Sequence, residues 1–129
     1  MRTLTIELPW PPKGLSPNAR LTRFAKASLF KKTKMQAYLL TRAASAATKY
    51  RISIPKGTLV NLTLVCDPPV LRYRDEDNLI ANCKAYFDGI AQAIGIDDHF
   101  FHFREQLWRT PKKPGKLTIC LDWKEEFDV

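Results

Sequence analysis

Residues 75–98 constrain the fold of this chain more than any other segment, because acids stand at both ends of a helix-like stretch. This segment holds six of the thirteen acids of a chain whose net charge is +8. These acids are Asp75, Glu76, Asp77, Asp88, Asp97 and Asp98. Carboxylates gathered so closely repel one another unless a cation lies among them. We therefore expect a Mg²⁺ site, since this ion takes oxygen ligands and often binds through one or two carboxylates.

The residues between these acids have the pattern of an amphipathic helix that ends at Gly95. Helical residues rotate by about 100° each, so the apolar positions fall within one arc and form a core face. These positions are Leu79, Ile80, Cys83, Phe87, Ile90 and Ile94. Asp77, Ala81, Lys84 and Asp88 form a column beside that face. This column is either part of a catalytic site or an ordinary helix surface with a Lys84–Asp88 ion pair.

The rest of the chain predicts strands and one further helix. Strands are expected at residues 3–8, 58–66, 99–109 and 116–123, and a helix at roughly 28–50. The last two strands are expected to pair as a hairpin. The order β-α-β-α-β-β predicts a mixed α/β (α+β) fold, a single mixed sheet covered by two main helices, in one domain over residues 1–129. On the first helix an apolar stripe is expected at Leu29, Met35, Leu39, Ala43, Ala46 and Ala47.

Charge is divided unevenly along the chain. Residues 1–60 hold twelve Lys and Arg against one acid, whereas residues 61–110 hold five against eight. A basic half beside an acidic cluster is typical of a protein that holds a polyanion in one region and processes it in another. Phe24 and Phe30 stand among the basic residues of the first half. They serve either to stack on bases or as core anchors.

Other residues indicate the compartment and exclude some chemistry. Three widely spaced cysteines, Cys66, Cys83 and Cys120, are expected to be reduced in a cytoplasmic protein. No apolar run approaches the roughly 20 residues that span a bilayer, and the N-terminus lacks a signal-peptide pattern. His99 and His102 would point to opposite faces of a strand, which argues against a shared zinc ion. No organic cofactor is expected.

The acidic segment resembles the signature of RusA-type Holliday-junction resolvases. The resemblance rests on Arg-Asp-Glu-Asp-Asn-Leu at residues 74–79, on Lys-Ala-Tyr-Phe-Asp-Gly-Ile at 84–90 and on Gly-Ile-Asp-Asp at 95–98. The opening Ile-Glu-Leu-Pro-Trp-Pro-Pro is also similar to that family's N-terminus. By this resemblance Asp75, Asp77 and Asp98 are essential acids that bind Mg²⁺, or Mn²⁺ in its place, with Asp97 as a close neighbour. Lys84 would be the catalytic lysine.

The position of the lysine departs from the family pattern. Relatives place it four residues after the second acid, where this chain has Ala81, and Lys84 comes at seven. Three added residues keep the direction on a helix but move the side chain by about 4.5 Å along the axis. Three explanations stay open: a long side chain that makes up the difference, a helix that starts later, or a Lys84 that is not catalytic.

The resulting expectation is a Mg²⁺-dependent endonuclease that resolves four-way DNA in recombination and repair, as a homodimer in a bacterial or phage-infected cell. Hydrolysis would leave a 5′-phosphate and a 3′-hydroxyl. The DNA backbone would be held by Arg72, Arg74, Lys31, Lys32, Lys34, Arg104 and Arg109. One alternative is a non-catalytic basic nucleic-acid-binding protein, and another is a metal-dependent nuclease or phosphatase without junction preference.

Overall fold

The computed structural model describes residues 1–48, 52–70 and 76–125, without the side chains of Glu76 and Asp77. Its strands are β1 (Arg2–Pro9), β2 (Val60–Asp67), β3 (Phe101–Trp108) and β4 (Lys116–Trp123). Its α-helices are α1 (Arg23–Ala46), α2 (Glu76–Asn82) and α3 (Lys84–Ile94). Two 3-10 turns, η1 (Lys13–Leu15) and η2 (Asp98–Phe100), complete the elements. The predicted α+β class, with one four-stranded mixed sheet and the order β-α-β-α-β-β, is confirmed.

The strand order across the sheet is β1-β4-β2-β3. β4 is antiparallel to both of its neighbours, while β3 runs parallel to β2. The predicted hairpin of the last two strands is therefore wrong, because β2 lies between them. β4 alternates buried and half-buried residues, as a central strand does, whereas most of β3 is exposed. The charged residues of β3 suit an edge strand, which has only one neighbour.

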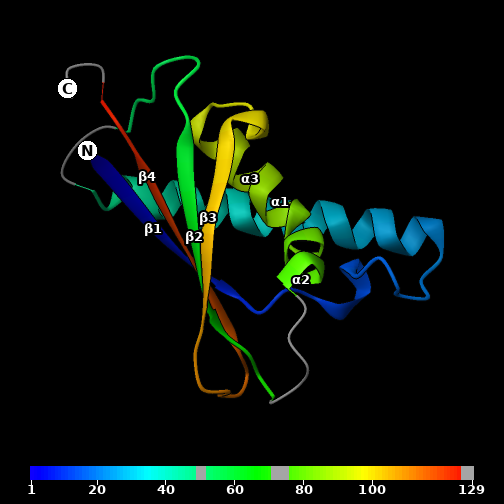
Figure 1. Cartoon of the computed structure of the whole chain (residues 1–129). Helices are drawn as coiled ribbons and strands as arrows, with labels where there is room; N and C mark the ends of the chain where they lie inside the picture. The colour runs from blue at the N-terminus through cyan, green and yellow to red at the C-terminus, as the bar shows by residue number, and fades with distance from the viewer. Residues whose placement is uncertain (49–51, 71–75, 126–129) are drawn as a thin grey trace.

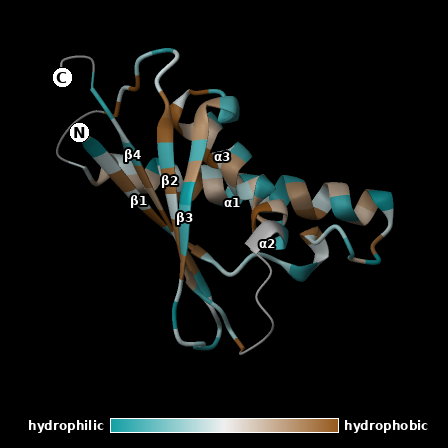
Figure 2. Ribbon diagram, in the orientation of Figure 1, coloured by the Kyte–Doolittle hydropathy of each residue, from teal (hydrophilic) through white to brown (hydrophobic). Residues whose placement is uncertain are grey.

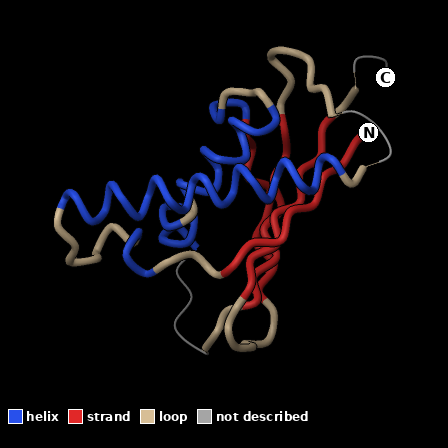
Figure 3. Tube along the Cα trace, turned by 180° about the vertical axis from the view of Figure 1, so that it is seen from behind, coloured by secondary structure: helices blue, strands red, loops and turns tan. Residues whose placement is uncertain are grey.

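Helices cover one face of this sheet. Figure 3 shows α1 crossing in front of the strands when the molecule is seen from behind, and Figure 1 shows the N-terminal part of α1 extending beyond the sheet. The strands point alternate side chains into this layer, as in β1, where Leu4, Ile6 and Leu8 are buried and the residues between them are exposed. Among the described residues, no helix is long and apolar enough to cross a membrane.

α1 buries a different face from the one that its apolar residues predict. Met35 and Leu39 are 53% and 58% exposed, whereas the buried positions are Thr33, Ala37 and Thr41. Figure 2 shows hydrophilic and hydrophobic residues mixed along this helix. Small residues are buried because α3 approaches closely: a Cβ added to Gly89 would lie 2.3 Å from the Lys34 carbonyl oxygen. The close approach of the two backbones therefore favours small residues at these buried positions.

α1 also begins earlier than expected. The Thr22 side chain accepts a hydrogen bond from the backbone N–H of Ala25, at 3.1 Å, and so caps the first turn. Because this cap stands six residues before Ser28, the helix starts at Arg23 and ends at Ala46. The last predicted helical residues, 49 and 50, lie outside the part that the structure describes.

The second predicted helix is divided into α2 and α3. At Cys83, between them, the backbone has φ −93° and ψ 3°, and its N–H contacts the carbonyl oxygens of both Leu79 and Ile80. One straight helix from Asp77 to Ile94 was therefore an incorrect expectation. The predicted core face is confirmed, since Leu79, Cys83, Phe87 and Ile90 are buried and Ile80 and Ile94 pack against the core. Gly95 ends α3 in the left-handed region, with φ 74°.

Candidate active site

A cluster of charged side chains lies where the start of α3 meets η2. The Lys84 ammonium nitrogen is 3.8 Å from a carboxylate oxygen of Asp88 and 3.7 Å from one of Asp98. Asp88 follows Lys84 by one helical turn, and Asp98 is brought back to them by the turn at Gly95. Lys84 is the first residue of α3, although helix already begins at Glu76 with α2. One predicted acid and the predicted lysine are thus neighbours.

The pKa values of the two aspartates in this cluster are shifted in opposite directions. Burial and the hydrogen bond with Asp98 raise the pKa of Asp88, although Lys84 and Lys34 act against this rise. The same hydrogen bond lowers the pKa of Asp98, with Lys84 and Asp97 contributing in the same direction. Of the two carboxyls, the more buried Asp88 therefore binds a proton at the higher pH. Asp88, Asp97 and Asp98 outnumber the two lysines, Lys84 and Lys34, which leaves the cluster able to attract a further cation.

Asp97 has a local structural task. Its carboxylate accepts a hydrogen bond of 2.9 Å from the backbone N–H of His99 and so caps η2. This cap fixes the turn in which Asp98 stands, so that Asp98, not Asp97, forms the ion pair with Lys84. That Asp97 also contributes to the metal site stays a prediction.

The predicted metal site is described only in part. Asp75 and the side chain of Asp77 lie outside the described residues. Within residues 1–48, 52–70 and 76–125, no three His, Cys, Asp or Glu side chains are gathered closely enough to hold a metal ion. The two described carboxylates still fit Mg²⁺, because oxygen donors are what this ion prefers and one or two of them are enough. Of the described residues, Asp98 would hold the ion, while Asp88 pairs with the Lys84 ammonium.

The residues predicted to bind DNA lie at several places. Lys31 and Lys32 are exposed on α1, while Lys34 lies close enough to the acidic cluster to lower the pKa of Asp88. Arg104 lies 3.9 Å from Asp122 on the sheet face without helices, and Arg109 is paired with Asp67 at the end of β3. Arg72 and Arg74 are outside the described part of the chain. The described basic residues therefore do not form one patch.

Asp88 is the residue whose part in the site the sequence reasoning missed. Its spacing of four residues from Lys84 was visible but fits an ordinary surface ion pair equally well. Proximity to Asp98, ten residues further on, comes only from the turn at Gly95. Phe87, beside it, packs its ring 4.9 Å from that of Phe103 and so anchors this part of α3 on β3.

Comparison with known proteins places the chain in a family. No protein-family model matches it. Over 121 residues, 94% of this chain and 76% of the relative, it is 39% identical to a protein of Xylella fastidiosa (strain Temecula1 / ATCC 700964) that is described as uncharacterized. The chain belongs to the same family as this Xylella protein.

Proposed function

We propose that this protein is a Mg²⁺-dependent, structure-selective DNA endonuclease of the RusA type, which cuts four-way junctions as a homodimer. The observation that carries the proposal is the position of the Lys84 ammonium, 3.8 Å from Asp88 and 3.7 Å from Asp98. The resemblance implies that Lys84 and Asp98 are catalytic. These two residues are separated by fourteen positions in the sequence and are neighbours in space. A mixed α+β fold with an acidic cluster at one end of a helix agrees with this assignment.

Each charged residue has a distinct role in the proposed reaction. Asp98, together with Asp75 and Asp77, would hold the ion; when bound, Mg²⁺ stabilises negative charge on the phosphate and orients the attacking water. Lys84 is exposed on one side and can place its ammonium beside a phosphate oxygen, where it offsets the charge that develops during cleavage. Asp88 keeps this ammonium in place from one turn further along α3.

Junction selectivity is proposed to come from symmetry. Two copies related by a twofold axis would place two such sites at a fixed separation, and only branched DNA would present two equivalent strands to them. Contacts with phosphates would position the substrate without reading bases. Size-exclusion chromatography with light scattering tests the dimer directly, and a monomer at micromolar concentration would contradict this part of the proposal.

The test compares two neighbouring substitutions. Labelled four-way and linear duplex DNA are incubated with protein in Mg²⁺, in Mn²⁺ or in EDTA. Asp98→Asn should lower the rate of junction cleavage more than about 100-fold, because several kcal/mol of charge stabilisation are lost, while junction binding remains. Asp97→Asn is the matched control: asparagine caps a helix as well as aspartate does, so cleavage should stay close to the parental rate.

Three outcomes would decide between the alternatives. Parental cleavage by Asp98→Asn would overturn the assignment of the site. Binding that falls steeply with salt, without cleavage in either metal ion, would indicate a non-catalytic nucleic-acid-binding protein. Equal cleavage of linear and four-way DNA would indicate a general nuclease without junction preference.

A further inference from the structure

A pocket of about 520 Å³ lies at the end of the sheet where β2 and β3 finish. It is lined by the last residues of β1 and β2 and by the connection between β3 and β4. The charged residues of its wall are Glu7, Asp67, Arg109, Lys112, Lys113 and Lys116. Four bases therefore face two acids, which gives the wall an excess of positive charge.

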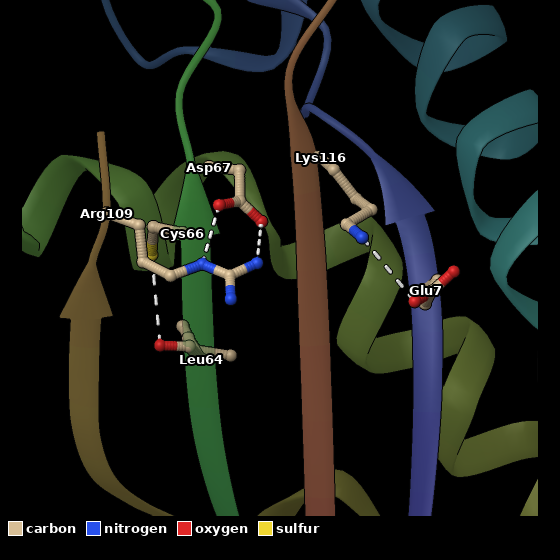
Figure 4. A network of polar contacts seen from close by, with 6 residues as sticks. All are labelled: Glu7, Leu64, Cys66, Asp67, Arg109 and Lys116. Atoms are coloured by element: carbon tan, nitrogen blue, oxygen red, sulfur yellow. Dashed lines mark hydrogen bonds and ion pairs between the residues drawn. The ribbon is translucent and has the colours of Figure 1, made fainter. Parts of the chain in front are cut away.

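The two acids of the pocket are both engaged by bases. Asp67 receives two hydrogen bonds from Arg109, at 2.7 Å from Nε and 2.6 Å from Nη2, and Glu7 lies 3.5 Å from the Lys116 ammonium. Figure 4 shows both pairs side by side across β2, β4 and β1. The hydrogen bonds from Arg109 lower the pKa of Asp67, and nearby Lys116 and Lys112 add to this effect. Asp67 thus acts as a positioning residue for the guanidinium.

The bidentate geometry leaves part of Arg109 available. Its Nε and Nη2 face Asp67, while Nη1 makes no hydrogen bond with any residue in the described part of the chain. The side chain is 56% exposed, so this remaining edge can meet a ligand. A guanidinium held in this way offers directed N–H donors without first losing side-chain freedom.

Backbone contacts hold the connection that carries the lysines. The N–H of Arg109 donates to the carbonyl of Cys66 at 2.9 Å, and the N–H of Lys112 donates to that of Pro68 at 2.8 Å. Gly115 adopts φ 90°, and a Cβ there would lie 2.8 Å from a Pro69 side-chain atom. These contacts fix the β3–β4 connection against the end of β2. Lys112 and Lys113 are therefore brought to the pocket by a pinned backbone.

We propose that this pocket binds a phosphate group through Lys112, Lys113 and the outer edge of Arg109. Phosphate fits better than a single carboxylate, because several oxygens can each meet a separate donor. Neither lysine has an ion pair with an acid among the described side chains, so both charges are available to the ligand. The source is either a phosphate of the DNA backbone, which rests on the proposed function, or a small phosphate compound.

The first experiment uses inorganic phosphate as the probe. The Arg109 Nε–H signal is followed by NMR as phosphate is added at constant ionic strength, without divalent metal. We expect a saturable shift in the parental protein. In the double variant Lys112→Gln, Lys113→Gln, the affinity for phosphate that this shift measures should be at least tenfold weaker. The matched control is Lys56→Gln with Lys124→Gln, which removes the same charge from exposed lysines outside the pocket. Both double variants should unfold at the parental temperature, since all four lysines are exposed.

The second experiment identifies the source. Binding of four-way DNA is measured in EDTA at several salt concentrations. If the ligand is a backbone phosphate, the pocket variant should lower the slope of log affinity against log salt by about 1 to 2 relative to the control, since each lost phosphate contact removes about 0.9. An unchanged slope with lost phosphate binding would assign the pocket to a small phosphate compound.

The outcomes are separable from those of the nuclease proposal. No saturable phosphate shift, or the same shift in the pocket variant as in the parental protein, overturns the pocket. Neither the phosphate titration nor the measurement of junction binding needs cleavage or Mg²⁺. A protein that binds phosphate through this pocket but cuts no DNA would therefore reject the proposed function and keep the pocket.

Discussion

Two charged sites stand at opposite ends of β3, and they use the same side-chain types in opposite proportions. Asp98 precedes the strand and, with Asp88, shares one lysine. Arg109 follows the strand and belongs to a pocket where bases outnumber acids. An eight-residue strand separates them by about 26 Å. The first site has carboxylate oxygens in excess, and the second has N–H donors in excess.

The difference shows that an ion pair does not by itself define what a site binds. Lys84 with Asp98 and Arg109 with Asp67 are both salt bridges. What matters is the charge that is left after the pair has formed: negative at the acidic cluster, which favours a cation, and positive at the pocket, which favours an anion. A substrate that carries phosphates and needs a metal ion to be cut would use both.

The largest effect is expected from Gly89→Ala, which should damage the acidic cluster and spare the pocket. The added Cβ would lie 2.3 Å from the Lys34 carbonyl oxygen, so α1 and α3 must separate and Lys34 must move away from Asp88. Overpacking of this kind costs about 1–3 kcal/mol or more, against a gain in helix propensity of up to about 1 kcal/mol. Urea denaturation should report a net loss of stability.

Gly14→Ala is the matched control for this prediction. The nearest atoms there are the side-chain ends of Leu29 and Leu21, at 2.6 and 2.7 Å, which can rotate away. The loss of stability should therefore be smaller. A Gly89→Ala protein as stable as the parent would show that the close contact between α1 and α3 does not exist in solution.

An intermediate effect is expected from Lys84→Gln. The ammonium lowers the pKa of both Asp88 and Asp98, so its removal should raise both values. Carboxyl ¹³C NMR titration of the metal-free protein measures this change. Lys31→Gln, which removes an exposed lysine from α1, should leave both titrations as they are. If the two variants behave alike, Lys84 does not act on the aspartates.

The smallest effect is expected from Asp67→Asn at acid pH. Arg109 lowers the folded-state pKa of Asp67, whereas in the unfolded chain this pKa is near the ordinary value of about 3.9. The unfolded chain therefore binds a proton at a higher pH than the folded protein does. The ion pair therefore stabilises the protein above that pH and loses this contribution as pH falls through the folded-state pKa. The urea midpoint of the parent should drop more than that of Asp67→Asn between about pH 4 and pH 2.

Arg109→Gln provides the control, since it removes the same pair from the other side. Both single variants and the double variant should show the same flattened acid dependence. A steep drop that persists in all three would assign the acid sensitivity to other carboxyl groups.

The sequence predicted the fold class because periodicity reports burial directly. The core face that runs from α2 into α3 follows from the spacing of Leu79, Cys83 and Ile90, and all three are buried. The pairing of β3 was predicted wrongly because neighbouring strands in a sequence favour a hairpin. The charged residues of β3 and the apolar alternation of β4 already distinguish an edge strand from a central one.

The candidate site was predictable only as far as local spacing reaches. Lys84 with Asp88 follows from one helical turn, and the return of Asp98 follows from Gly95. The break at Cys83 has no sequence signal, since no proline or glycine marks it. The pocket was also hidden, because Asp67 and Arg109 are 42 residues apart and meet only through the parallel pairing of β2 with β3.

The outer edge of β3 has a consequence for how copies of this chain can meet. Its pairing with β2 shifts register between Leu62 and Thr63, which leaves Arg104 as an extra residue. Charged side chains and such an irregularity hinder the addition of a foreign strand. This border of the sheet is therefore a poor template for a strand of a second molecule.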